Sequence, residues 1–277
     1  MDDTDRATTR ALAANAIDPE WYDAIRTRTS RRRYDGAPVA PDILGKLHAL
    51  TVRFRPSPAA RIAVVDTAPP ELFTGLVGSY GGVKGAPSAG LIIATEGGRV
   101  DAGYAGEALI LEATRLGLGT CWLAGMFGKK RAQTLTDLAP GESVVAVTPI
   151  GRATEKLSGT ERAMRGAARS SNRKPLEELA PGVTTESWPA WAMTALEAAR
   201  LAPSGANGQP WRFRLEDGAL VLSTAKGVYW TAPFDFGIAM LHVELGALKA
   251  GVAGAWEREL AEPDIARFVP DAGEVPS

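Results

Sequence analysis

The feature that most constrains the fold of this chain is an internal repeat. Residues 101–122 align with residues 235–256 without a gap, at a constant offset of 134 positions, the difference between 101 and 235 and between 122 and 256. Identical residues include Asp101 and Asp235, Gly103 and Gly237, Ala105 and Ala239, Leu111 and Leu245, Ala113 and Ala247, Gly117 and Gly251, and Trp122 and Trp256. Such self-similarity indicates a repeated structural unit. We therefore predict two related halves, each built on a central apolar helix.

The best place to divide the chain is the basic segment 152–174, which has few large apolar side chains and is expected to be surface or loop. Pro181 and Gly182 follow it and favour a break between units. We predict a first half over residues 19–180 and a shortened second half over residues 181–264. Residues 1–18 and 265–277 are expected to be tails.

Apolar patterning predicts the main elements of both halves. A helix is expected over residues 105–116, with strands over 61–65, 89–95 and within 142–150. In the second half, strong helix formers occupy residues 192–201, and an alternating pattern begins at Trp211.

The composition argues against several classes of function. The formal net charge of −1 gives no electrostatic reason to expect a nucleic-acid partner. No apolar stretch is long enough to span a membrane and the N-terminal residues are polar, so a soluble, cytoplasmic protein is expected. Cys121 is the only cysteine, which excludes an intrachain disulfide and favours a buried structural thiol. His48 and His242 lack the spacing of a zinc motif.

Residues from Trp21 onward predict a short helix that runs into a dense basic cluster, which contains Arg28, Ser30 and Arg32. On extended backbone, side chains at alternate positions point the same way. Two guanidinium groups and a hydroxyl on one face would form a phosphate clamp, because arginine presents a donor fork that matches phosphate oxygens. The alternative is a solvated basic face.

A second polar stretch, residues 203–211, lies between a predicted helix and a predicted strand and presents backbone and amide groups. Taken alone, it could equally be an ordinary connecting loop. Neither half carries both polar stretches: the first half offers only residues 55–58 as a counterpart of 203–211, and residues 182–191 carry no basic cluster. This pattern is expected if a symmetric dimer with two equivalent sites was fused and one site decayed.

Together these residues resemble the nitroreductase family of flavin enzymes, and most closely its single-chain, duplicated members. The family pattern Arg-x-Ser-x-Arg/Lys, followed by an aromatic residue, is present from Arg28 to Tyr34. The pattern Ala-Pro-Ser-x-x-Asn-x-Gln-Pro-Trp is present from Ala202 to Trp211 without a mismatch. Two further family features are a helix that ends in Leu-Gly-x-Gly at residues 116–119 and the run Arg-Lys-Pro-Leu-Glu-Glu-Leu at 173–179.

The resemblance implies an α+β fold with a mainly antiparallel sheet and flanking helices in each half. Family members normally work as dimers that bind FMN at the interface. Because both parts of such a site occur here in one chain, the resemblance implies one FMN per chain and a monomer arranged as a pseudo-dimer.

The resemblance also implies a role for each motif residue. The phosphate and ribityl chain would be held by Arg28, Thr29, Ser30 and Arg32, helped by Arg173 or Lys174. The ring would be contacted from the second half by Pro203, Ser204, Gly205 and Asn207, with Gln209 holding the loop, and beside the ring by Leu123, Ala124 and Gly125. Ser79 and Tyr80 stand where relatives often contact the pyrimidine. At Ala124 some relatives have an acidic side chain, so their nicotinamide and substrate contacts do not carry over there.

The activity implied is reduction of a small electrophile, such as a nitroarene or quinone, with NADH or NADPH as electron donor in a ping-pong cycle. Such chemistry needs no side-chain nucleophile, in keeping with a sequence without a Ser-His-Asp or Cys-His constellation. The alternative is a protein that stores or sequesters FMN without turnover. A Rossmann-type dehydrogenase does not fit, because Gly117 and Gly119 end a helix instead of opening one after a strand.

Overall fold

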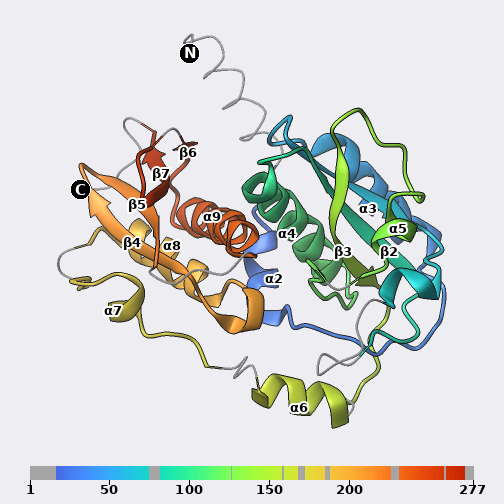
Figure 1. Ribbon diagram of the computed structural model, residues 1–277. Coiled ribbons are helices and arrows are strands. Elements are labelled where there is room, and N and C mark those ends of the chain that lie inside the picture. Colours follow the sequence, from blue (N-terminus) through green and yellow to red (C-terminus); the bar gives the residue numbers. More distant parts are fainter. Residues whose placement is uncertain are drawn as a thin grey trace.

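The computed structural model describes residues 17–74, 82–125, 127–157, 159–167, 172–184, 188–225, 231–258 and 260–271. At its centre lie two long helices, α4 (Arg99–Arg115) and α9 (Ala232–Lys249), packed side by side (Figure 1). Both are almost wholly buried, as predicted for the central apolar helices of the repeat. A sheet lies on the outer side of each helix, which gives the molecule two lobes.

The first lobe contains an antiparallel sheet in the order β1 (Ala60–Val65), β2 (Ser88–Ala94) and β3 (Ser143–Ile150). These are the strands predicted from apolar runs. Every residue of β2 is buried, because α4 covers one face of the sheet and a second apolar cluster covers the other. This second cluster includes η1 (Pro70–Phe73) and α5 (Lys129–Ala132).

The second lobe contains an antiparallel sheet in the order β4 (Trp211–Glu216), β5 (Ala219–Thr224), β7 (Asp264–Pro270) and β6 (Gly254–Glu257). Asp217 and Gly218, both with positive φ, form the two-residue turn between β4 and β5, a sequence that favours such hairpins. Because β7 pairs with both β5 and β6, residues 265–270 belong to the sheet and not to a tail.

The remaining helices connect and cover the lobes. In the first lobe, α2 (Trp21–Thr27) packs against α4, and α3 (Pro41–Arg53) covers β1. In the second lobe, α8 (Ala190–Leu201) packs along α9, and α7 (Leu176–Leu179) contacts α8 and β4. The segment 152–174, predicted to be surface or loop, contains the helix α6 (Gly159–Ala167), which lies beneath both lobes (Figure 1). The prediction missed this helix because its residues carry few large apolar side chains.

The contact between the central helices depends on glycines of the repeat. A Cβ atom on Gly103 would lie 2.0 Å from the carbonyl oxygen of Phe234, and one on Gly237 would lie 1.8 Å from that of Val100. Phe234 and Val100 are separated by the repeat offset, so each helix makes the same contact with the other. Only glycine allows this approach.

The two helices also end in the same way. Gly117 and Gly251 have φ values of +79° and +80°, just after their helices. In each case the following residue donates its N–H to a carbonyl five residues back, at 2.8 Å for Leu118 and 2.9 Å for Val252. This is the glycine-capped helix end that the sequence predicted at Gly117.

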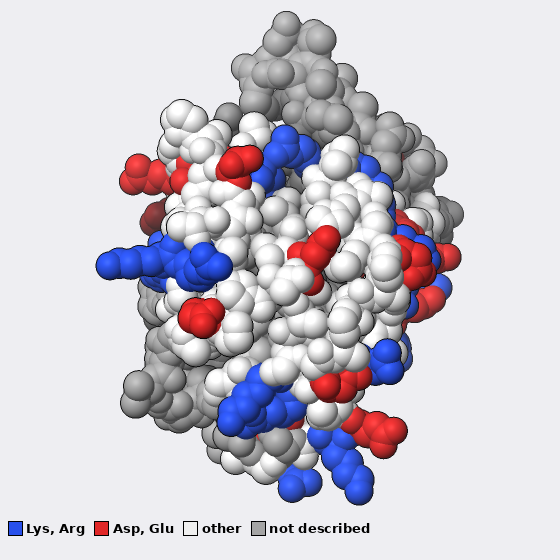
Figure 2. All heavy atoms as spheres, turned by 90° about the vertical axis from the view of Figure 1, so that its right-hand side faces the viewer, with Lys and Arg blue, Asp and Glu red and all other residues white. Residues whose placement is uncertain are grey.

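The predicted α+β class is confirmed: both lobes combine an antiparallel sheet with flanking helices. Cys121 is buried, as expected. On the face of the first lobe shown in Figure 2, acidic and basic side chains are interspersed instead of gathered by sign. Among the described residues, no helix is long and apolar enough to cross a membrane, and no group of His, Cys, Asp or Glu could hold a metal ion.

Candidate functional site

The basic cluster leaves α2 as extended backbone, as predicted. The helix ends at Thr27, and the Arg28 backbone turns out of the helical region, with ψ at 122°. Ser30 then pairs with Thr120 in a parallel bridge, and the Arg31 N–H donates to the carbonyl of Thr120 at 2.8 Å. These backbone contacts fix the cluster against the segment that follows α4.

The guanidinium groups of this cluster have donors that the protein does not satisfy. Among the described residues, the Nε atoms of Arg28, Arg31 and Arg32 are buried and have no hydrogen-bond partner. Leaving a buried donor unpaired costs roughly 1–3 kcal/mol, and more for a charged group. Native structures contain few such atoms, so their concentration here fits a site that receives an anion rich in acceptor oxygens.

The second polar stretch forms a tight loop around η2 (Gly205–Asn207). Ala206, Asn207 and Gln209 all have positive φ, between 45° and 58°, a region that side chains other than glycine seldom adopt. Hydrogen bonds hold this geometry: the Gln209 N–H donates to Ser204 Oγ at 3.0 Å, and the Gly205 N–H donates to both carboxylate oxygens of Asp235 at 3.1 Å.

Asp235 lies in the first turn of α9, so the central helix anchors the loop.

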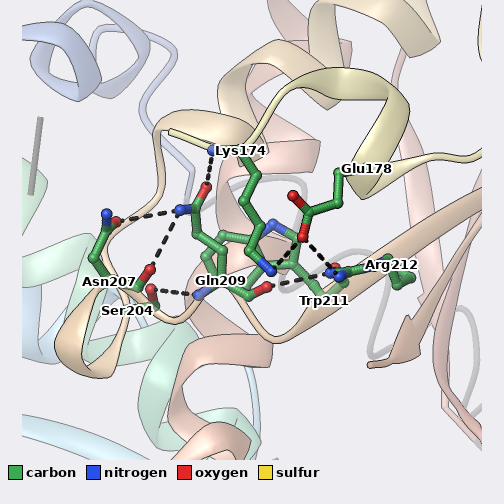
Figure 3. Close-up of polar contacts among 7 residues, drawn as sticks. All are labelled: Lys174, Glu178, Ser204, Asn207, Gln209, Trp211 and Arg212. Carbon is green, nitrogen blue, oxygen red and sulfur yellow. Dashed lines mark hydrogen bonds and ion pairs between the residues drawn. The ribbon is translucent and has the colours of Figure 1, made fainter. Parts of the chain in front are cut away.

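The segment before α7 is bound to this loop (Figure 3). The Lys174 N–H donates to Gln209 Oε1 at 3.0 Å, and the Gln209 amide nitrogen contacts the Asn207 carbonyl at 3.3 Å. Arg173 donates to Asn207 Oδ1 and, at 3.1 Å, to the carbonyl of Leu201. Lys174 also forms an ion pair with Glu178 at 2.7 Å, so its ammonium group already has a carboxylate partner.

Arg173 lies where the two polar stretches meet. Burial, followed by the positive charges of Arg28 and Arg200, lowers the pKa of Arg173 to about 10. Arg28 belongs to the first cluster, whereas Asn207, which Arg173 contacts, belongs to the second. Arg173 therefore holds the second stretch and lies within electrostatic reach of Arg28 in the first.

The other predicted site residues fall into three groups. Leu123 forms a reciprocal backbone pair with Val147, at 3.0 and 3.1 Å, and Ala124 and Gly125 follow it, half-buried. Thr29 and Pro203 lie within the two polar stretches, and both are half-buried. Ser79 and Tyr80 lie outside the described residues.

A buried polar network links the lobes and was not predicted. Glu107 of α4 accepts a hydrogen bond from Trp122 Nε1 at 2.7 Å, and its other oxygen lies 3.0 Å from Nε2 of His242 on α9. Nδ1 of His242 donates to the carbonyl of Ala198 on α8 at 3.0 Å. Glu107 also acts electrostatically on Arg173, so the network lies close to the cationic group. The sequence signal was the presence of Glu107 and His242 within the largely apolar stretches that form α4 and α9.

Comparison with known families decides the relationship. The family described as "Putative TM nitroreductase" matches residues 20–247. The chain belongs to this family. The resemblance drawn from the sequence motifs is therefore confirmed at the family level, and membership of the nitroreductase family supports an oxidoreductase.

A solved structure of a putative nitroreductase shows the same fold. The structure of a putative nitroreductase from Thermotoga maritima MSB8 matches with a TM-score of 0.60 and 20% identity, covering 92% of this chain and 94% of that one. A nitroreductase with bound FMN from Bacteroides fragilis NCTC 9343 matches with a TM-score of 0.40 and 17% identity, covering 50% of this chain and 90% of that one. No curated protein sequence matches. The Thermotoga maritima structure carries the conclusion about fold.

Proposed function

We propose that this nitroreductase-family protein binds one FMN where its two lobes meet and uses it as an NAD(P)H-dependent oxidoreductase. The observation that carries the proposal is a group of half-buried arginines whose Nε atoms are buried and, among the described residues, have no hydrogen-bond partner, within electrostatic reach of the arginine that holds a pre-formed polar loop of the other lobe. Such a pair of features suits a ligand with an anionic end and a planar, hydrogen-bonding end.

The residues fit the two ends of FMN. Arg28, Ser30 and Arg32, with Thr29 in the same motif, would hold the phosphate, and Arg173 would add charge from the other side. Lys174 would contribute mainly through its backbone, since its side chain pairs with Glu178. The ring would lie between the loop of Pro203, Ser204, Gly205 and Asn207 and the edge formed by Leu123, Ala124 and Gly125.

When bound, FMN would supply the redox chemistry by accepting hydride from NADH or NADPH and reducing an electrophile such as a nitroarene or quinone. The chain's own residues would bind and orient the reactants. Asn207 is fixed by Arg173 and donates to the Asn172 carbonyl at 2.7 Å, so its position does not depend on a ligand. Arg173 would stabilise negative charge that develops nearby.

The pseudo-dimer is part of the proposal. A dimer with a twofold axis places the same patch of both subunits in reciprocal contact. Gly103 of α4 approaches α9 in the same way as Gly237 of α9 approaches α4, so one chain contains a reciprocal contact of the kind that a twofold dimer has between subunits. We therefore expect the protein to work as a monomer with one flavin.

The test is spectroscopic. Purified protein should be yellow, or become so with added FMN, and should bleach anaerobically with NADH or NADPH before a panel of nitroarenes and quinones reoxidises it. A colourless protein that takes up no FMN would contradict the proposal. FMN uptake without reduction by either nicotinamide would favour storage or sequestration instead.

A further inference from the structure

The exposed helix α6 inserts one acidic side chain into the basic cluster. Among the α6 residues whose exposure is described, Gly159, Arg162, Ala163 and Gly166 are exposed, whereas Glu161 is 1% exposed. Its Oε1 atom accepts a hydrogen bond from the Arg32 N–H at 2.7 Å and lies 3.8 Å from Nε of Arg31. The buried carboxylate of Glu161 thus ties α6 to the cluster.

The same carboxylate lies near the rest of the expected phosphate clamp. Burial raises the pKa of the Cys121 thiol, and the negative charge of Glu161 raises it further. The positive charges of Arg32 and Arg28, together with the Ser30 side chain, act in the opposite direction and lower this pKa. One buried thiol therefore lies within electrostatic reach of Arg28, Arg32 and Glu161, and close to Ser30. The carboxylate and the clamp share one small region.

A carboxylate and a phosphate make the same demands on such a region. Both are acceptor-only anions that bind backbone N–H groups and guanidinium forks. Glu161 uses the Arg32 N–H and faces Arg31, while the Nε atoms of the neighbouring arginines, among the residues described, have no hydrogen-bond partner. Two anions that close together would also repel each other strongly in a buried site.

We propose that Glu161 is an internal competitor for the phosphate of the ligand, so that filling the clamp releases α6 from the protein. This inference rests on the proposed FMN site and adds a determinant of its affinity. Binding of the phosphate displaces the carboxylate from the Arg32 N–H. The helix, whose other described residues are exposed, then loses a buried anchor.

The first test compares FMN affinity, measured by quenching of flavin fluorescence on titration with the full-length apoprotein. Glu161→Gln should bind FMN about tenfold more tightly than the wild type, the equivalent of about 1.4 kcal/mol. Glu155→Gln is the matched control, because it removes the same charge from an exposed position in the same connecting segment. This control should leave the affinity unchanged.

The second test uses the wild-type protein and needs no variant. Saturating FMN should accelerate tryptic cleavage after Arg162, an exposed residue next to Glu161. Inorganic phosphate at high concentration should act in the same direction.

The outcomes separate this inference from the proposed function. Equal or weaker FMN binding by Glu161→Gln, or slower cleavage with FMN, would overturn the competition and leave the flavin site intact. Failure of both wild type and variant to bind FMN would overturn the proposed function and this inference with it.

Discussion

Asp235 and Asp101 occupy matching positions in the first turns of α9 and α4, yet their carboxylates have different partners. Asp235 accepts the Gly205 N–H and so holds the polar loop. Asp101 forms an ion pair with Arg258 Nη1 at 2.5 Å. The same acidic position thus anchors a candidate binding loop in one lobe and pairs with an arginine side chain in the other.

The difference shows where packing constrains the repeat and where it does not. At the crossing of α4 and α9, each helix is the other's packing surface, so Gly103 and Gly237 face the same requirement. At the helix starts, each carboxylate faces a different segment. Matching residues at the crossing therefore report on packing, whereas matching residues at the starts can serve different purposes.

The largest loss of stability should come from substitutions at the contact between α4 and α9. Gly237→Ala would place a methyl group 1.8 Å from a backbone oxygen, and Gly103→Ala would do so at 2.0 Å. Each should cost more than about 3 kcal/mol in the free energy of unfolding, measured by urea denaturation, or prevent folding. Gly45→Ala in α3, where a Cβ meets nothing within 4 Å, is the control and should not destabilise. If one of the two central glycines tolerated alanine, the crossing would not be equivalent from both sides.

The carboxylate of Glu244, buried where α9 meets α4, should make the stability of this helix contact depend on pH. Burial raises the pKa of Glu244 from 4.5 to about 7, although the Tyr104 hydroxyl of α4 donates to it at 2.6 Å. The folded state therefore binds the proton of the Glu244 carboxyl group more tightly than the unfolded state does. This tighter binding adds to the free energy of unfolding in full below pH 4.5, and the added stability is lost as pH rises through about 7.

The loss amounts to about 3 kcal/mol and should be seen in unfolding free energies measured at several pH values. Glu244→Gln should remove this part of the pH dependence. An unchanged profile in the variant would assign the dependence to other groups.

A substitution in either polar stretch should weaken binding of the same flavin. Arg28→Ala and Asn207→Ala lie in different lobes but should weaken the same FMN site, by about tenfold to a hundredfold for the arginine and about tenfold for the asparagine. Titration should give one flavin per chain. Two flavins per chain, or normal binding by Asn207→Ala, would refute a single site shared between the lobes.

The smallest effects should distinguish the two aspartates. Asp235→Ala leaves the Gly205 N–H without this acceptor and should weaken FMN binding by about tenfold. Asp101→Ala removes a partly exposed ion pair, so it should cost less than about 1 kcal/mol of stability and leave FMN binding unchanged. Equal effects of both variants on FMN affinity would contradict the inference that only Asp235 supports the binding loop.

Much of the fold follows from local signals. The repeat predicted both central helices, and Gly117 marked a helix end because a left-handed residue there is easiest for glycine. Apolar runs predicted β1, β2 and β3. The strand β7 was missed, although alternating burial of Ala266 and Phe268 marks its inner face.

The site was only partly predictable. The two polar stretches are sequence motifs, so the sequence predicted both; Arg173 contacts the second stretch and lies within electrostatic reach of Arg28 in the first. Glu161 and the pair of Glu107 and His242 were missed because their contacts join residues far apart in the chain. No spacing rule relates such residues, and their partners become visible only when the helices are packed.

The left-handed backbone of Ala206, Asn207 and Gln209 has a consequence for binding entropy. Each such residue costs on the order of 1–3 kcal/mol, and here that cost is met during folding through the contacts of Ser204, Asp235 and Lys174. A ligand that docks on this loop does not have to freeze it. Its affinity can therefore draw on contacts that are already in place, without the ordering penalty that a flexible loop would impose.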